Sequence, residues 1–315
     1  MAQIVSPVTE KATGVEHWIT KGNIPLLLWE KFLPSARASF DDSLTPILVL
    51  VHGSSMASTP TFDLDVPGRP DYNVMDYFAQ RGYDVWCFDC EGYGRSDKLR
   101  DIPCDVATGA DDCEAAARYI QSVRGARPLH FCGISSGALR PALFAERHPE
   151  QVRRLALHAF VWTGDGSPTL EERRKRLPEY VAGGNRRPID AALVRSIFTR
   201  DHPGTADQEV IDAFGRAILA LDDSVPIGTY VDMCAKLPLV DPERIIAPTL
   251  ITRGEYDGIA SLGDLLEFFS RLATSDKQFV VLPGMAHSAP QEKNHHLWLD
   301  VVERFFAQPV PEYRG

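Results

Sequence analysis

The sequence lacks any hydrophobic run long enough to cross a membrane. Its apolar stretches are short, as in Ile47 to Val51, whereas a membrane-spanning helix needs about 20 such residues. The first residues also lack the basic start and the apolar stretch that together make a signal peptide. We therefore expect a cytoplasmic protein with no membrane partner.

Positive charge is scarce, since 33 Lys and Arg stand against 43 Asp and Glu and the formal net charge is −10. Proteins that bind nucleic acids concentrate positive charge on one surface, so we expect no nucleic-acid partner. Basic residues gather only in the run from Glu171 to Arg176 and in the pair Arg186–Arg187. The simpler interpretation of these clusters is a solvated helix face with charge pairs four residues apart. The alternative is a site for a substrate carboxylate.

Cysteine is also rare, with six irregularly spaced residues in the whole chain. Cys87 and Cys90 form a C-x-x-C pair, a spacing that redox and zinc sites share. Both fall in a strand-like run, where an odd separation places the two side chains on opposite faces. We therefore expect buried, reduced thiols, which suit a reducing cytoplasm, and no metal site.

What the sequence does contain is an alternation of buried strands and helices over most of its 315 residues. Pro46 to Val51 is apolar on both faces, which is typical of a central parallel strand, and a hairpin signal at Lys21 to Asn23 precedes it. Further strands are expected at 83–88, 129–134, 155–160, 248–252 and 278–282, and helices at 74–81, 113–123, 138–147, 262–272 and 297–306. This order predicts an α/β fold, with a parallel sheet covered by helices on both faces.

Residues 161–242 interrupt the alternation. No clear strand occurs there, and the apolar spacing predicts helices at 170–180, 189–198, 206–221 and 230–237. We therefore predict a core domain of residues 1–160 and 243–315, and a helical cap domain of residues 161–242. Trp162 directly follows a strand, so it either packs in the core of the cap or lines a substrate pocket.

The strongest chemical signal is the motif Gly133-Ile134-Ser135-Ser136-Gly137, which fits G-x-S-x-G between an expected strand and an expected helix. A serine on such a turn is held in an unfavourable backbone conformation, so the residues two before and two after it must be small. The helix start below it also stabilises negative charge. We interpret Ser135 as a nucleophile, and a tight structural turn is the alternative.

A serine hydroxyl needs a base and a carboxylate that orients the base. His287 follows the expected strand Gln278 to Leu282, at the sheet edge where active sites of α/β proteins collect. Asp257 follows the preceding strand in the same way, and Glu255 is its nearby rival. The chain order of Ser135, Asp257 and His287 is the order of the α/β-hydrolase triad.

An oxyanion hole requires two backbone N–H groups near the nucleophile. Ser136, directly after the nucleophile, is expected to supply the first. The loop His52-Gly53-Ser54-Ser55 follows an early strand, and we expect Ser54 to supply the second, with Ser55 as the second choice and a further pocket residue. A plain polar loop is the alternative interpretation of this segment.

Taken together, His52 to Ser55, F-D-C-E-G-Y-G-R-S-D ending at Asp97, G-I-S-S-G, Y-D-G and M-A-H resemble the α/β-hydrolase superfamily over nearly the whole chain. Residues 62–86 are also similar to a subgroup that includes monoalkyl phthalate ester hydrolases. The chain departs from many relatives at Glu91 and at Ser136. The resemblance implies a mostly parallel eight-stranded sheet flanked by helices, with a helical cap inserted after the sixth strand, and no cofactor.

The serine at position 135 excludes sister reactions of this fold that use an aspartate or cysteine nucleophile. The prediction is a serine esterase that cleaves a small carboxylic ester through an acyl-enzyme, with an aromatic monoester as one candidate. Amide, carbamate or C–C bond hydrolysis and acyl transfer remain alternatives on the same triad, and a non-catalytic ligand-binding protein is a more remote one. We expect a small-molecule partner, and a monomer or a homodimer.

Overall fold

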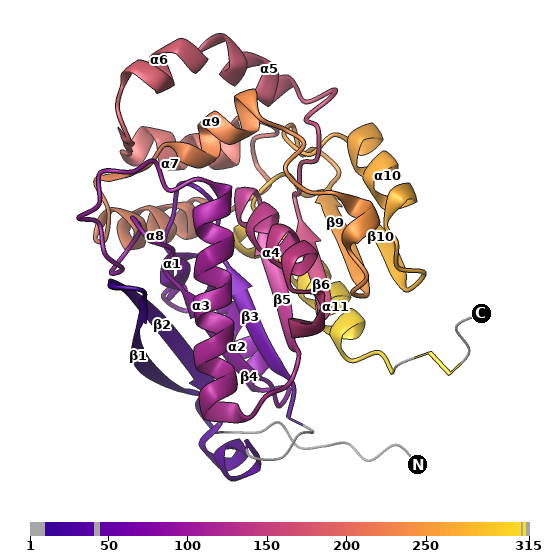
Figure 1. The fold of residues 1–315 in the computed structure, drawn as a ribbon. Helices are drawn as coiled ribbons and strands as arrows, with labels where there is room; N and C mark the ends of the chain where they lie inside the picture. The colour runs from indigo at the N-terminus through magenta and orange to yellow at the C-terminus, as the bar shows by residue number, and fades with distance from the viewer. Residues whose placement is uncertain (1–9, 41–44, 310, 313–315) are drawn as a thin grey trace.

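The computed structural model describes residues 10–40, 45–309 and 311–312 (Figure 1). Its centre is an eight-stranded sheet with the strand order β1-β2-β4-β3-β5-β6-β9-β10. β2 runs antiparallel to both β1 and β4, and all other neighbouring strands of the sheet are parallel. The strands are β1 Thr13–Lys21, β2 Ile24–Phe32, β3 Ile47–Val51, β4 Asp84–Phe88, β5 Leu129–Ile134, β6 Val152–His158, β9 Thr249–Gly254 and β10 Lys277–Leu282. This confirms the predicted fold class.

Helices cover both faces of the sheet. α3, α4 and α10 pack on one face and α2 and α11 on the other, with α3 and α4 in front of the sheet in Figure 1. The helices outside residues 161–242 are α1 Ser58–Phe62, α2 Val74–Ala79, α3 Val106–Arg124, α4 Ser136–Arg147, α10 Leu262–Arg271 and α11 His295–Phe306. Short 3-10 turns lie at Pro34–Ser39, Pro70–Tyr72, Pro149–Gln151, Pro242–Arg244 and Ala289–Gln291.

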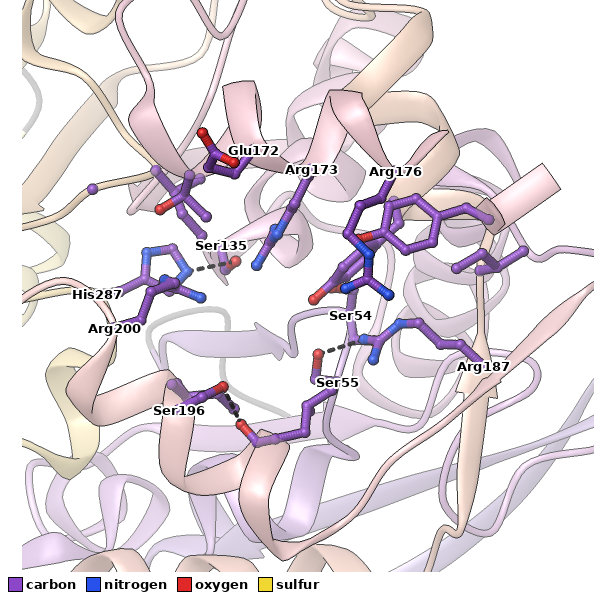
Figure 2. A pocket seen from close by; sticks show the side chains of 18 of the residues that line it. Ser54, Ser55, Ser135, Glu172, Arg173, Arg176, Arg187, Ser196, Arg200 and His287 are labelled. Carbon is purple, nitrogen blue, oxygen red and sulfur yellow. Dashed lines mark hydrogen bonds between the residues drawn. The ribbon is translucent and has the colours of Figure 1, made fainter. Parts of the chain in front are cut away.

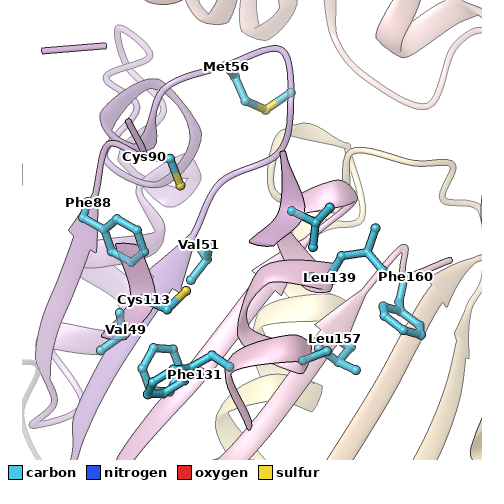
Figure 3. Packing of buried hydrophobic residues seen from close by; sticks show 14 of the residues in the cluster. Val49, Val51, Met56, Phe88, Cys90, Cys113, Phe131, Leu139, Leu157 and Phe160 are labelled. Atoms are coloured by element: carbon cyan, nitrogen blue, oxygen red, sulfur yellow. The ribbon is translucent and has the colours of Figure 1, made fainter. Parts of the chain in front are cut away.

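Strand β3 shows how the sequence pattern produces this layering. All five of its residues are buried; Val49 and Val51 pack into the core under α3 and α4, while Leu48 and Leu50 pack into the core under α2 and α11. Figure 3 shows Val49 and Val51 beside Phe131, a residue of the neighbouring strand β5. A strand that is apolar on both faces therefore lies inside the sheet, as predicted.

Several predicted boundaries differ from the structure, and two of the differences have a clear local reason. Helix α3 begins seven residues before the predicted start at Cys113, because the Asp105 side chain caps it by accepting the Thr108 N–H. Strand β6 ends two residues before the predicted end at Phe160, because Ala159 has a φ of +51° and turns the chain out of the sheet.

Residues 161–242 lie between β6 and β9 and lie over the carboxyl ends of the central strands (Figure 1). Their elements are α5 Pro168–Lys175, α6 Leu177–Ala182, β7 Arg186–Pro188, α7 Ala191–Thr199, α8 Gln208–Leu219, β8 Ser224–Pro226 and α9 Gly228–Ala235. We call residues 161–242 the inserted segment. The antiparallel pair of β7 and β8 was not predicted, because three-residue strands are too short for a periodic pattern. The single helix predicted at 170–180 is divided into α5 and α6 at Arg176.

The cysteines are all buried and unbridged. Cys87 packs in one core and Cys90 in the other, on opposite sides of the sheet, as the odd spacing predicts. Within the described ranges, no helix is sufficiently long and apolar to pass through a bilayer.

Candidate active site

The loop between β5 and α4 presents Ser135 at the carboxyl edge of the sheet. Its φ of +59° and ψ of −133° lie in a region that residues with a side chain rarely adopt. The Ser135 N–H donates to the carbonyl of His158 on β6 at 2.8 Å, which holds this strained turn in place. The hydroxyl therefore projects from a fixed backbone into the space above the sheet.

The two glycines of the motif make this turn possible, as expected. A Cβ at Gly133 would lie 2.4 Å from the carbonyl oxygen of Gly137, and one at Gly137 would lie 2.1 Å from the carbonyl oxygen of His52. These distances are far below van der Waals contact. The close approach of β5 to the start of α4 therefore requires glycine at 133, and the close approach of α4 to the loop after β3 requires glycine at 137.

The structure brings Ser135, His287 and Asp257 together from three separate loops. The Oγ of Ser135 lies 2.8 Å from Nε2 of His287, and Nδ1 of His287 lies 3.0 and 3.1 Å from the two carboxylate oxygens of Asp257. His287 and Asp257 are both buried. This is the geometry in which an imidazole receives a proton from the hydroxyl while the carboxylate holds its other nitrogen protonated.

The Asp257 carboxylate is ionised in its buried position. Burial alone would raise its pKa, but His287 and the N–H groups of Ile259 and Ala260 lower the pKa to about 2. Its rival Glu255 is exposed and accepts the Gly284 N–H. Asp257, and not Glu255, therefore contacts the histidine.

The loop from His52 to Ser55 lies directly against the nucleophile, as expected of an oxyanion loop. A Cβ at Gly53 would be 3.4 Å from Cβ of Ser135, and Ser54 and Ser55 line the same cavity as Ser135. Ser136 is the first residue of α4, so its N–H has no intrahelical acceptor. Of the two predicted donor residues, Ser54 therefore lines the cavity together with Ser135, and Ser136 directly follows Ser135 at the start of α4.

Two buried residues, His52 and Arg140, fix this loop. The sequence patterns did not reveal this role for either residue. Nε2 of His52 accepts the Cys90 N–H at 3.0 Å, so its proton is on Nδ1, which faces the Gly53 carbonyl at 2.7 Å. Burial is the main cause that lowers the pKa of His52 to about 3, which keeps the ring neutral. Arg140 of α4 donates to the His52 carbonyl at 2.8 Å. The loop and the nucleophile helix are thus tied together.

Glu292 is a further residue that sequence reasoning missed. It is fully buried, and its two oxygens accept the N–H groups of Ala286 and Ser288, the residues on either side of His287, at 2.6 and 2.9 Å. Burial raises the pKa of this carboxyl. Glu292 therefore holds the backbone that carries the imidazole.

A cavity of about 890 Å³ opens above Ser135 and His287. The core contributes Ser54 and Ser55, and the inserted segment contributes the opposite wall, including Arg173, Arg187, Ser196, Arg200 and Tyr230. Figure 2 shows Arg173 pointing toward Ser135, Arg200 beside His287, and Arg187 pointing toward Ser55. The simpler interpretation of the run at 171–176 therefore does not hold for Arg173, which faces the cavity and not the bulk solvent.

Trp162, expected as a candidate pocket residue, is placed elsewhere. It borders a separate, smaller hollow together with Val240 and Arg271, and it is not one of the described residues that line the cavity above Ser135. Its Nε1 donates to the Val240 carbonyl at 3.1 Å and its ring packs beside Phe268. The other interpretation, packing in the core, describes this residue.

The described residues contain one group with a spacing that suits a metal ion, formed by Asp201, Asp257 and His287, whose ligand atoms lie within 4.8 Å of one another. Each already has a partner in the structure. Asp257 and His287 bind each other, and Asp201 pairs with Arg200 through contacts of 2.8 and 2.9 Å.

Comparison with known proteins places this geometry in a family. The family model described as serine aminopeptidase, S33, matches residues 68–294. A monoacylglycerol lipase of Mycolicibacterium smegmatis is 24% identical over 236 residues, which cover 73% of this chain and 80% of the lipase. An esterase of Thermogutta terrifontis, solved with malate bound, superposes with a TM-score of 0.63 at 18% identity over 92% of this chain and 97% of the esterase.

A further relative carries a different activity in its name. The 2-hydroxy-6-oxononadienedioate/2-hydroxy-6-oxononatrienedioate hydrolase of Paraburkholderia phymatum is 32% identical over 125 residues, which are 39% of this chain. The match spans only 38% of that hydrolase, and 42% of its counterpart from Burkholderia vietnamiensis. Because the family model covers well over half of the chain, the protein belongs to the serine aminopeptidase S33 family and is a member of the α/β-hydrolase superfamily.

Proposed function

We propose that the protein is a serine hydrolase that cleaves a small carboxylic ester through an acyl-enzyme intermediate. The observation that carries the proposal is the continuous contact from Ser135 through His287 to Asp257, with contacts of 2.8 to 3.1 Å. The cavity of about 890 Å³ above Ser135 is of the size that small-molecule sites have. The lipase and the esterase among the similar proteins are in keeping with this activity.

In the first half of the reaction, the Oγ of Ser135 attacks the ester carbonyl carbon while Nε2 of His287 takes the hydroxyl proton. The carbonyl oxygen becomes an oxyanion, which the N–H groups of Ser54 and Ser136 stabilise together with the start of α4. The C–O bond to the alcohol then breaks, and the imidazolium gives its proton to the leaving oxygen. Asp257 stabilises the imidazolium and stays ionised.

In the second half, water attacks the acyl-enzyme. His287 takes a proton from the water, the second oxyanion forms at the same two N–H groups, and its collapse releases the acid and returns the proton to Ser135. We propose that the inserted segment, residues 161–242, acts as a cap domain over a core of residues 1–160 and 243–315, and limits access of water to this step. Six reduced thiols are in keeping with a cytoplasmic location.

The test is covalent labelling by a fluorophosphonate together with turnover of 4-nitrophenyl butyrate. The native protein should react quickly, and Ser135→Ala should lose both labelling and turnover while its circular dichroism spectrum is unchanged. Ser196→Ala is the matched control, because Ser196 lines the same cavity but its hydroxyl donates to the Leu193 carbonyl. Normal activity in Ser135→Ala would refute the mechanism, and a native protein that neither reacts nor turns over would support a ligand-binding role.

A second candidate is hydrolysis of a C–C bond, which the partial match to the 2-hydroxy-6-oxononadienedioate/2-hydroxy-6-oxononatrienedioate hydrolases favours. The same serine and histidine would serve it, since the fold does not decide the bond. A vinylogous 1,5-diketone acid and a set of esters, offered separately, distinguish the two activities by product analysis. Added alcohol in the ester assay reveals acyl transfer as a new ester product.

A further inference from the structure

The wall that the inserted segment contributes to the cavity is rich in arginine. Five arginines but only three carboxylates line the cavity, although the whole chain carries a formal net charge of −10. Positive charge gathered in the pocket of a negatively charged molecule favours a negatively charged ligand.

All three cavity carboxylates are already paired. Asp201 binds Arg200, and Glu179 binds Arg176 at 2.9 Å. The third, Glu172, pairs with a lysine outside the cavity. Among the residues that the structure describes, no carboxylate forms an ion pair with Arg173 or Arg187. Arg186 likewise has no carboxylate partner among the described residues, but its guanidinium donates to the Gly92 carbonyl and to the hydroxyl and carbonyl of Ser224, so Arg173 and Arg187 are the cavity guanidinium groups left for a ligand carboxylate.

Arg187 is buried and only part of its guanidinium has a partner. Its Nη2 donates to the Ser54 carbonyl at 3.0 Å and to the Ser55 hydroxyl at 2.6 Å. Its Nε and Nη1 are buried without a hydrogen-bond partner. Buried donors are nearly always satisfied in native proteins, so this pair of donors indicates an acceptor that the free protein does not itself supply.

Tyr230 connects the two arginines. The guanidinium carbons of Arg173 and Arg187 lie 4.4 and 4.1 Å from the centre of its ring. Burial alone would raise the pKa of the Tyr230 phenol, but Arg173 and Arg187 lower it to about 7. Removal from solvent, together with Arg200 and Arg187, lowers the pKa of Arg173. The lowered pKa of Tyr230 indicates that positive charge dominates this part of the cavity, where added negative charge is stabilised.

We propose that Arg173 and Arg187 form a subsite for a free carboxylate of the substrate, so that the preferred ester carries an ionised carboxyl group besides the carbonyl that Ser135 attacks. The inference rests on the proposed function and names its substrate class. The planar guanidinium donates two parallel hydrogen bonds to a carboxylate, which an ammonium group cannot match. Figure 2 shows Arg173 pointing toward Ser135 and Arg187 toward Ser55, and all four residues line one cavity, so a ligand in that cavity contacts the subsite and the serine together.

Binding to the catalytically inactive Ser135→Ala protein tests the subsite without any turnover. The probes are benzoate and its neutral analogue benzamide, measured by titration calorimetry. Benzoate should bind more tightly than benzamide. Adding Arg173→Gln or Arg187→Gln should weaken benzoate binding about tenfold to a hundredfold, since hydrogen bonds to charged groups are worth this much. Equal binding of the two probes, or benzoate binding that neither change weakens, overturns the proposal.

Arg174→Gln is the matched control, because Arg174 neighbours Arg173 on α5 but donates to the Thr163 carbonyl and does not line the cavity. Arg173→Lys is the second variant if Arg173→Gln fails to fold. It keeps the charge but loses the planar pair of donors, so it should restore benzoate binding in part. Full loss in Arg173→Lys together with a changed melting temperature would mean a structural role, which overturns the assignment for Arg173.

Kinetics on the native active site extend the test to substrates. One pair is 4-nitrophenyl hydrogen adipate and 4-nitrophenyl methyl adipate, with the carboxylate in the acyl part. The other is 4-acetoxybenzoate and its methyl ester, with the carboxylate in the alcohol part. The ratio of kcat/KM between anionic and neutral ester should fall about tenfold or more in Arg173→Gln for at least one pair. A fall that is equal for anionic and neutral esters in both pairs overturns the proposal.

The two tests separate this proposal from the proposed function. A protein that binds benzoate through Arg173 but does not react with a fluorophosphonate has the subsite without the hydrolase mechanism. A protein that hydrolyses neutral and anionic esters alike, with unchanged ratios in Arg173→Gln, has the mechanism without the subsite.

Discussion

The substitution Asp257→Asn tests the assigned role of the carboxylate most directly, because the contacts fix how an amide would sit. Oδ1 accepts the N–H groups of Ile259 and Ala260 at 2.8 and 3.1 Å. The amide oxygen of an asparagine must take this place, since an NH2 group there would face two donors. The NH2 group then occupies the position of Oδ2, which lies 3.1 Å from Nδ1 of His287.

An NH2 group that donates to Nδ1 places the imidazole proton on Nε2, in competition with the amide oxygen, which already accepts two N–H groups and lies 3.0 Å from Nδ1. The ring then presents a donor to the Ser135 hydroxyl and can no longer accept its proton. We expect kcat to fall about 10⁴-fold, as for the equivalent change in the serine protease triad, which corresponds to about 5.5 kcal/mol. The fold should be unaffected, because asparagine has nearly the same size.

The assay is steady-state hydrolysis of 4-nitrophenyl butyrate, with thermal unfolding as the check on folding. Glu255→Gln is the control, because Glu255 is exposed and close in sequence; its kcat should stay within about twofold of the native value. A kcat of Asp257→Asn within tenfold of the native enzyme would show that the carboxylate does not set the tautomer of His287.

Three further outcomes follow from the packing and the titrating groups. Gly137→Ala should abolish activity and soluble expression, since its Cβ would lie 2.1 Å from the His52 carbonyl oxygen; an active, soluble variant in an expression and activity assay would contradict this. In Glu292→Gln, one of the two backbone N–H groups beside His287 faces an amide NH2 and loses its acceptor. We expect kcat to fall about tenfold to a hundredfold with KM little changed. An unchanged kcat would show that Glu292 does not position His287. Burial is the main cause that lowers the pKa of His130 from 6.5 to about 3. The folded protein therefore keeps this ring neutral at a pH where the unfolded chain protonates it, and the free energy of unfolding falls as the pH drops from 6.5 toward 3, by up to about 1.4 kcal/mol per pH unit. Urea unfolding at pH 7 and pH 5 should show that the free energy of unfolding falls less between these pH values in His130→Leu than in the native protein. An identical fall in both proteins would contradict the lowered pKa of His130.

Much of the sheet and the three triad positions could be predicted, because strong local signals lie at defined places in the chain. Buried strands such as β3 are apolar on both faces, and G-x-S-x-G combines a turn that needs glycine with a serine. Asp257 and His287 each follow a predicted strand, and parallel strands bring such loops to one edge. The structure then places these side chains in contact.

The residues around the triad could not be predicted in this way, because their roles depend on distant partners. Nothing near Glu292 in the sequence shows that it brackets His287, and the buried link from Arg140 to His52 joins residues 88 positions apart. The cavity wall was the hardest part. Arg173 lies in a charged run that resembles a solvent-exposed helix, and only the folding of α5 over the sheet turns it toward Ser135.

The place where the inserted segment leaves and rejoins the sheet has a consequence for how such a protein diversifies. The segment departs after β6 and returns before β9, and these two strands are hydrogen-bonded neighbours. Its two ends are therefore anchored side by side, and the Ala159 N–H still bonds to the Thr252 carbonyl at the point of departure. Recombination at these two neighbouring ends can replace the whole inserted segment, including its arginines. Ser135, Asp257 and His287 all lie on loops outside the inserted segment, so a replaced segment changes the cavity wall without changing these three residues.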